Sequence, residues 1–121
     1  MNDELIIEAI SEEETLGSSK KLLISKRNRI VWHKKLFLLK EQFKYGEIVN
    51  FEIKVDYNSE RNRCRYIEAN LFLITVDKKN KKVFTIDKNI RGQQELIEFE
   101  MLKEIEHLIE IISNETGKNH T

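Results

Sequence analysis

Apolar residues near the C-terminus recur every three or four positions, which is the spacing of one face of an α-helix. The stripe predicts a helix near residues 96–113, and this helix is amphipathic because glutamates fill many of the intervening positions. The members of the stripe are Leu96, Phe99, Leu102, Ile105, Ile109 and Ile112. A competing interpretation makes residues 96–99 a short last strand and starts the helix near Glu100.

The middle of the chain changes to an alternation of apolar and polar residues, the pattern of a strand with one solvated face. It predicts strands near residues 48–57, 64–76 and 81–87. The second of these is apolar on both faces in its second half, so it should be central or covered by a helix. Polar residues 77–80 predict a hairpin turn before the last strand. The expected core contains Leu71, Leu73, Phe84, Leu102, Ile105 and Ile109.

Residues 20–45 give a weaker signal. Two short apolar runs around a basic tip predict a hairpin over residues 20–31. Within residues 32–45, apolar residues recur at helical spacing, which favours a short helix before the sheet. The run of residues 36–39 also fits a buried strand, so both alternatives stand, with the helix favoured.

These elements predict an α+β fold. We expect a small antiparallel β-sheet or barrel with meander connections, a C-terminal amphipathic helix and a short helix before the sheet. Residues 20–121 should form one domain of this kind. Residues 1–19 are acidic and end near a Gly-Ser-Ser sequence, so we expect a flexible acidic N-terminal segment. Within it, residues 5–10 fit a short strand or a helical turn.

The 21 basic and 21 acidic residues cancel in number, but they are sorted along the chain. Residues 1–15 carry six acids and no base, residues 16–91 carry 19 bases against 8 acids, and residues 92–121 carry 2 bases against 7 acids. Partners respond to local potential rather than net charge, so the basic middle predicts contact with a polyanion or an acidic protein. The acidic N-terminus could compete for the same surface. The alternative, which is favoured, is that it stays a solvated acidic tail.

Two basic clusters lie at the ends of the predicted strand over residues 64–76. They supply the candidate residues for binding nucleic acid or another partner, namely Arg61, Arg63, Arg65, Lys78, Lys79, Lys81 and Lys82. We expect one positive rim, provided that the strand bends or the barrel closes, because such a strand is roughly 40 Å long at about 3.3 Å per residue. The alternative is that these charges protect sheet edges from aggregation.

Sequence motifs for catalysis are not found. The chain has no Gly-rich phosphate loop, no histidine pair at metal-binding spacing and no nucleophile elbow. One cysteine, Cys64, excludes an internal disulfide and a multi-cysteine zinc site within one chain. We therefore expect a cytoplasmic protein that is not an enzyme and needs no cofactor or metal. No apolar run approaches the ~18–20 residues of a membrane span, so no membrane partner is expected.

One pattern spans the middle of the chain and consists of Arg29-Ile30-Val31-Trp32, two long strands, Val83-x-x-Ile86-Asp87 and Ile97-x-Phe99. Over residues 29–99 this pattern resembles the YolD-like family of small bacterial proteins. Residues 51–57 would match the first barrel strand of that family, and residues 73–82 its central hairpin. The resemblance implies an Sm-like or SH3-like barrel and an accessory role linked to nucleic acid, and it carries over no functional residue.

Two classes of function follow from these features. The first is a small non-catalytic accessory protein whose basic β-surface contacts nucleic acid. The alternative is a small inhibitor or adaptor that binds a protein, of the kind that phages and mobile elements encode. Salt-dependent retention on DNA or RNA would distinguish the two, because phosphate contacts weaken steeply as salt rises.

Overall fold

The structure is a computed structural model, and it describes residues 4–8, 21–25, 29–34, 40–61 and 63–121. The described strands form two antiparallel sheets. Sheet A contains β1 (Glu4–Glu8), β2 (Lys21–Ser25), β3 (Ile30–Lys34) and β4 (Lys40–Lys44). After a short 3-10 helix, η1 (Tyr45–Glu47), sheet B contains β5 (Ile48–Arg61), β6 (Cys64–Thr75) and β7 (Asn80–Asn89). The chain ends with the helix α1 (Gln94–Thr116) and a short tail.

The C-terminal helix and the three predicted strands of the middle region are confirmed. The helix and the first and last strands are longer than expected, and the middle strand ends one residue earlier. The competing interpretation of residues 96–99 as a strand is wrong, because α1 already includes them. The described strands form two open sheets rather than a closed barrel, so the barrel implied by the family resemblance is not confirmed.

The sequence favoured a short helix over residues 32–45, and this prediction is wrong. Residues 30–34 and 40–44 instead form neighbouring strands, in which Val31 lies opposite Phe43. Both of these side chains are buried. A strand pair needs only alternate residues to face the core, and cross-strand pairing of this kind overrides a weak helical spacing. Residues 36–39, the alternative strand, lie outside the described residues.

The first strands of sheet A include two segments that the sequence left less certain. The predicted hairpin over residues 20–31 is confirmed, because β2 pairs with β3 in antiparallel register. Residues 4–8 form a strand, which was one of the two structures expected near the N-terminus, and it pairs with β2. Residues 1–3 and 9–20, which hold the other acids of the N-terminal segment, lie outside the described residues.

Sheet B is built on the alternation read from the sequence. One face carries Phe51 and Ile53 of β5 opposite Leu73 and Leu71 of β6. A β-bulge in the β6–β7 pair adds one residue, Val83, to β7, and Val83 is fully buried. The middle strand β6 is central, as its two-sided apolar pattern predicts.

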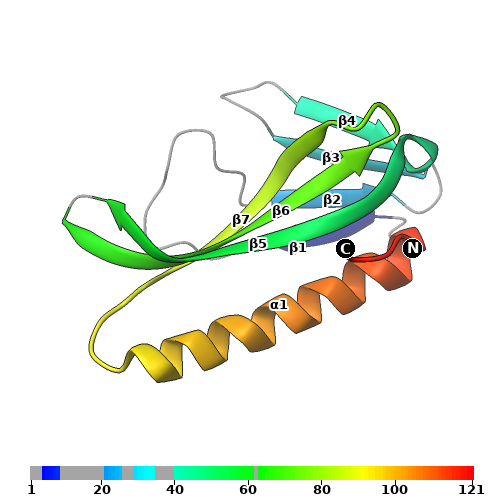
Figure 1. The fold of residues 1–121 in the computed structure, drawn as a ribbon. Helices are drawn as coiled ribbons and strands as arrows, with labels where there is room; N and C mark the ends of the chain where they lie inside the picture. The colour runs from blue at the N-terminus through cyan, green and yellow to red at the C-terminus, as the bar shows by residue number, and fades with distance from the viewer. Residues whose placement is uncertain (1–3, 9–20, 26–28, 35–39, 62) are drawn as a thin grey trace.

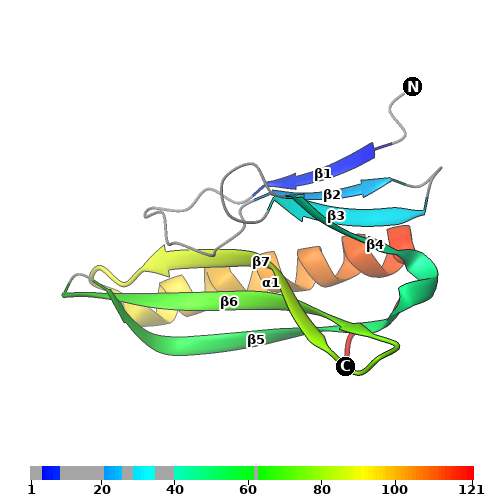
Figure 2. The ribbon, with the colours of Figure 1, turned by 90° about the horizontal axis from the view of Figure 1, so that it is seen from above.

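The helix α1 lies along one face of sheet B, and its C-terminal end reaches toward sheet A (Figures 1 and 2). Its buried side chains include Met101, Ile105, Leu108 and Ile112. An ion pair between Lys88 Nζ of β7 and Glu104 Oε1 at 2.8 Å adds a polar contact to this packing. One apolar cluster joins residues of both sheets and of the helix, so the two sheets share a core.

The predicted core is largely confirmed, with one error on the helix. Leu71, Leu73, Phe84 and Ile105 are buried, and Ile109 is half-buried against the same cluster. The assignment of Leu102 to the core is wrong, because 52% of its surface is exposed.

The helical repeat explains this error. Each residue advances an α-helix by about 100°, so three successive steps of three residues rotate the stripe by about half a turn. Leu96 and Ile105 therefore lie on opposite sides of α1. A straight helix that buries Ile105 must leave Leu96 exposed. Leu102 is rotated by about 60° from Ile105 toward Leu96, at the margin of the buried side, and both leucines are 52% exposed.

We predict that Ile105→Ala lowers the free energy of unfolding by ~2–5 kcal/mol, because it leaves a cavity under the helix. The matched control is Leu102→Ala, which removes a similar side chain from the exposed side of α1 and should cost about 0.5 kcal/mol or less. Chemical denaturation of both variants measures the two values. Similar losses in both variants would contradict the orientation of α1 described above.

Candidate functional site

The seven predicted binding residues fall into two groups at opposite ends of sheet B (Figures 1 and 2). Arg61, Arg63 and Arg65 lie at the β5–β6 turn, and the four lysines lie in and after the β6–β7 turn. The strand β6 has 12 residues, so roughly 40 Å of extended chain separates the groups at about 3.3 Å per residue. The expected single rim is therefore not formed.

The arginine group is open to solvent. Arg63 and Arg65 are exposed, and the Arg65 guanidinium donates a hydrogen bond of 2.8 Å to Asn58 Oδ1. Arg61 is the last residue of β5 and lies opposite Cys64, which is a free, exposed cysteine. This turn extends from one end of the molecule in Figure 1.

The lysine group is organised by a tight turn. The Lys78 N–H donates to the Thr75 carbonyl at 2.8 Å, and the Thr75 N–H donates to the Lys79 carbonyl at 3.0 Å. Lys78, Lys79 and Lys82 are exposed, and Lys81 is half-buried. The Asp77 carboxylate accepts a hydrogen bond from the Thr75 hydroxyl and lies 3.6 Å from Lys79 Nζ.

The 3-10 helix η1 brings a second basic turn to the same end. The Tyr45 N–H at its start donates to the Arg29 carbonyl at 2.9 Å, and the Glu47 carbonyl at its end accepts from the Val76 N–H at 2.9 Å. Three residues therefore connect the turn before β3 to the turn after β6. Lys44, just before η1, is exposed. We call Arg29, Lys44, Lys78 and Lys79 the basic end.

Sequence reasoning missed this grouping. The basic character of both hairpin tips is visible in the sequence, but the choice of tips that meet depends on η1 and on how sheet A is placed against sheet B. The sequence paired the lysine group with the arginine group, which is closer along the chain. The structure instead pairs it with Arg29 and Lys44.

Three basic residues adopt a strained backbone conformation at the hairpin tips. Among the described non-glycine residues, positive φ angles occur at Arg29 (54°), Arg63 (66°) and Lys78 (63°). This left-handed conformation costs an L-residue roughly 1–2 kcal/mol, whereas glycine adopts it freely. A charged side chain at a position where glycine would be less strained is a candidate functional residue.

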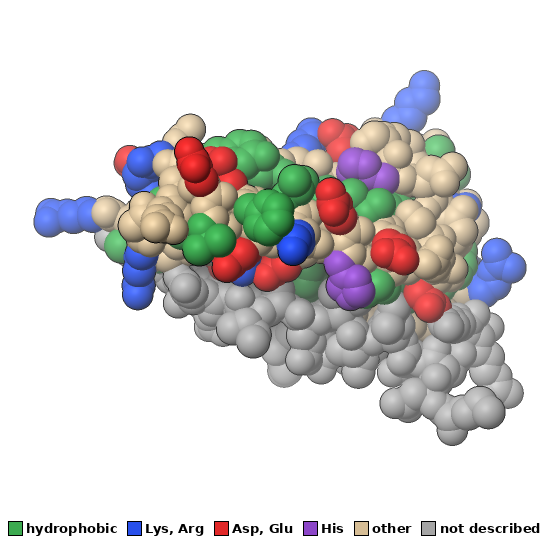
Figure 3. Space-filling view, turned by 90° about the horizontal axis from the view of Figure 1, so that it is seen from below, with side chains coloured by type: hydrophobic (Ala, Val, Ile, Leu, Met, Phe, Trp, Pro, Cys, Tyr) green, Lys and Arg blue, Asp and Glu red, His purple; other side chains and the backbone are tan. Residues whose placement is uncertain are grey.

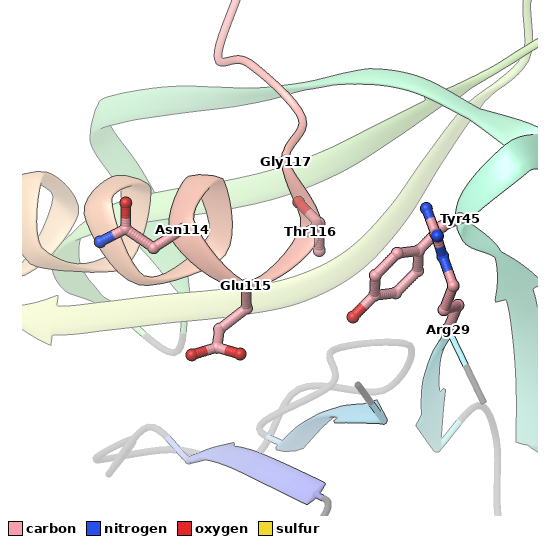
Figure 4. Close-up of a pocket in the computed structure, with 6 residues that line it drawn as sticks. All are labelled: Arg29, Tyr45, Asn114, Glu115, Thr116 and Gly117. Atoms are coloured by element: carbon pink, nitrogen blue, oxygen red, sulfur yellow. The ribbon is translucent and has the colours of Figure 1, made fainter. Parts of the chain in front are cut away.

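A pocket of about 360 Å³ lies beside Arg29, between the turn and the end of α1 (Figure 4). Its lining residues are Arg29, Tyr45, Asn114, Glu115, Thr116 and Gly117. The Arg29 guanidinium carbon lies 5.6 Å from the centre of the Tyr45 ring, a cation–π contact that positions the charge. The carbonyl end of a helix and the Glu115 carboxylate both repel anions, so this pocket does not suit a phosphate. The phosphate-accessible charges are those on the outer surface of the basic end.

Within the described part of the chain, no group of three or more His, Cys, Asp or Glu side chains is placed to hold a metal ion. The helix that the structure describes is not long and apolar enough to cross a membrane. Comparisons with protein-family models, with curated proteins and with solved structures returned no match. The candidate site therefore depends on the geometry of the basic end.

We predict that Lys78→Gly and Arg63→Gly each raise the free energy of unfolding by about 0.5–1 kcal/mol. Each change removes the cost of a left-handed L-residue, partly offset by the greater entropy of glycine in the unfolded chain. Chemical denaturation measures both values. Lys79→Gly is the control in the same turn, because Lys79 has no positive φ, and it should not stabilise the protein.

We also predict a pH dependence at the β6–β7 turn. The hydrogen bond from Thr75 lowers the pKa of the Asp77 carboxyl below its ordinary value of 3.8, and Lys79 acts in the same direction. A carboxyl with a lowered pKa stabilises the fold above its unfolded-state pKa, and this contribution is lost as the pH falls through the folded-state value. The stability difference between wild type and Asp77→Ala should therefore be constant at neutral pH and shrink below about pH 4. A difference that grows on acidification would contradict this assignment.

Proposed function

We propose that the protein is a small non-catalytic accessory protein whose basic end contacts the phosphate backbone of a nucleic acid. The observation that carries this proposal is the presence of cations at hairpin-tip positions where glycine would cost less, with Lys78 exposed at the basic end. Lysine and arginine on turns bind phosphates as exposed charges and release condensed counterions. The resemblance to the YolD-like family, which remains a prediction, implies a role of the same kind.

The acids near the basic end offset only part of its charge. The Asp77 carboxylate is engaged by the Thr75 hydroxyl and lies near Lys79. This arrangement holds the turn in shape while Lys78 stays exposed. The four cations of the basic end outnumber the nearby carboxylates of Asp77 and of Glu47, which is exposed on η1, so the net charge of this end is positive and favours a polyanion as its partner.

The cations continue from the turn onto the outer face of sheet B. Lys82 lies directly opposite Phe72, and Lys54 Nζ lies 5.1 Å from the centre of the Phe72 ring. The lysine covers the aromatic face on which a base would otherwise stack. Contact through phosphates therefore suits this surface better than base stacking, and binding should be insensitive to sequence.

We predict that Lys78→Gly weakens binding to an oligonucleotide and lowers the slope of log K against log salt by about 0.7–0.9, the value for one lost phosphate contact. The matched control is Arg63→Gly, which makes the same backbone change and removes the same charge at the other end of sheet B. Fluorescence anisotropy with a labelled single strand and a labelled duplex, at several salt concentrations, measures both variants. Because both variants should be more stable than wild type, weaker binding cannot come from unfolding.

Two outcomes would contradict this proposal. One is an equal loss in both variants, which would mean that net charge rather than the basic end determines binding. The other is the absence of binding by the wild-type protein to DNA or RNA at low salt, where phosphate contacts are strongest.

A further inference from the structure

An apolar groove lies along the first half of α1, away from the basic end. Leu96, Phe99 and Leu102 of α1 are 52%, 55% and 52% exposed, and Tyr57 of β5 is 48% exposed. A groove of about 420 Å³ is lined by Tyr57, Glu95, Glu98, Phe99 and Leu102. Figure 3 shows hydrophobic side chains gathered on this face, with acidic side chains around them. Large apolar side chains collected on one surface typically mark an interaction site.

The groove runs beside an edge strand. Among the strands that the structure describes, β5 pairs only with β6, so its other edge faces outward next to α1. Backbone groups of an antiparallel strand point alternately to the two sides. The outward set includes Phe51 and Ile53, because their N–H groups donate to Asn119 O at 3.0 Å and to His120 Nε2 at 3.1 Å. The register stays regular through Asp56 and shifts between Asp56 and Ser59, so the N–H and C=O of Val55 point to this edge and the strand bulges just beyond it.

The protein's own tail shows that this edge accepts an added strand. Residues 119–121 lie parallel to β5, with His120 beside Phe51. The Thr121 N–H donates to the Phe51 carbonyl at 2.8 Å. The tail covers the edge beside Phe51 and Ile53. Within the described residues, the edge from Val55 to Tyr57 has no such cover, and this is the part that borders the groove.

An added strand at this position would bring its side chains into the groove. Successive side chains of a strand alternate between the two faces of its sheet. One set would point to the face of sheet B that carries α1, and therefore between Tyr57 and Phe99. The main chain would supply hydrogen bonds and the groove would select the side chain, which is the usual division of roles in strand addition.

Charge determines the class of occupant. Glu95 and Glu98 line the groove. On β5 the Asp56 carboxylate accepts a hydrogen bond from the Asn58 N–H, and Glu60 lies opposite Arg65, so the acidic character of the groove comes from α1. The nearby cation Lys103 lies over the Phe99 ring, with its Nζ 4.6 Å from the ring centre. The Glu95 and Glu98 carboxylates repel nucleic acid and disfavour symmetric pairing with a second copy, because like charges would face each other.

We propose that the β5 edge from Val55 to Tyr57 and the adjoining groove bind an extended, basic segment of a partner protein, with an aromatic or branched aliphatic side chain seated between Tyr57 and Phe99. This site goes beyond the proposed nucleic-acid contact and uses a different end of the molecule. It supports the second class of function, that of a protein-binding adaptor or inhibitor. Both contacts can operate in one protein, because the groove and the basic end do not share residues.

The test uses the full chain as bait for a displayed library of random dodecapeptides. The counter-selection bait carries Leu96→Ser, Phe99→Ser and Leu102→Ser together. These side chains are exposed, so the variant should keep the wild-type Tm within a few degrees. We expect enriched peptides in which an aromatic or branched aliphatic residue is flanked by lysine or arginine. A synthetic copy should bind wild type about tenfold or more tightly than it binds the triple variant, as expected for loss of an interface anchor.

Backbone N-methylation of the peptide tests strand addition without altering the protein. Methyl groups at alternate residues remove the N–H donors of one side of the strand. One alternate set should weaken binding about tenfold or more, and the other set should leave it within about twofold, because only one side faces β5. Lys78→Gly in the protein should leave peptide affinity unchanged. Failure of the peptide-binding proposal is therefore distinguishable from failure of the nucleic-acid proposal.

Three results would overturn the proposal. In the first, the wild-type bait enriches no peptides over the triple variant, and in the second it enriches peptides that lack lysine and arginine. In the third, both N-methylated sets of the peptide bind with equal affinity. A dimer that the triple variant abolishes in sedimentation would assign the groove to a second copy. An oligonucleotide affinity that falls in the triple variant but not in Lys78→Gly would assign it to nucleic acid.

Discussion

The packing of one side of α1 against sheet B is the contact on which the rest of the molecule depends. Ile105, Leu108 and Ile112 reach the same apolar cluster as Leu71 of β6 and Val31 of β3, so the helix helps to hold the two sheets on a common core. A rigid helix that buries one side must expose the other. The apolar groove beside Tyr57 is therefore a direct consequence of how the core is formed. The same packing leaves the outer edge of β5 next to the exposed side of the helix.

Basic side chains and a strained left-handed backbone occur together at the hairpin tips. The described non-glycine residues with positive φ are all basic, and each lies in a turn between strands. Their long side chains keep the charge in water while their backbones close the turns. Sheet B separates two of these turns by the length of β6, whereas η1 joins the third to the β6–β7 turn. The basic middle of the sequence thus becomes two separate positive ends.

The outer edge of β5 is the part of the fold that is available for strand addition. An edge strand exposes unpaired backbone groups, which natural proteins cover or protect with charge. Here the tail covers the part beside Phe51, and the exposed acid Asp56 lies farther along. Acidic protection of this kind selects for a basic strand while it excludes another acidic edge. The acidic groove and the basic end give one small protein two surfaces of opposite sign.

The sequence by itself determined the elements whose signal is local. The alternation in residues 48–57 and 64–76, the polar turn at 77–80 and the long C-terminal stripe each set their own secondary structure, because period two and period 3.6 depend only on neighbouring residues. It also showed which turns are basic. Only the tertiary structure decided that residues 30–34 pair with residues 40–44 as strands, that Leu102 lies outside the core, and that Arg29 rather than Arg63 joins Lys78. The physical reason is that strand partners, the rotation of a helix about its axis and the meeting of turns are set by packing between segments distant in the chain.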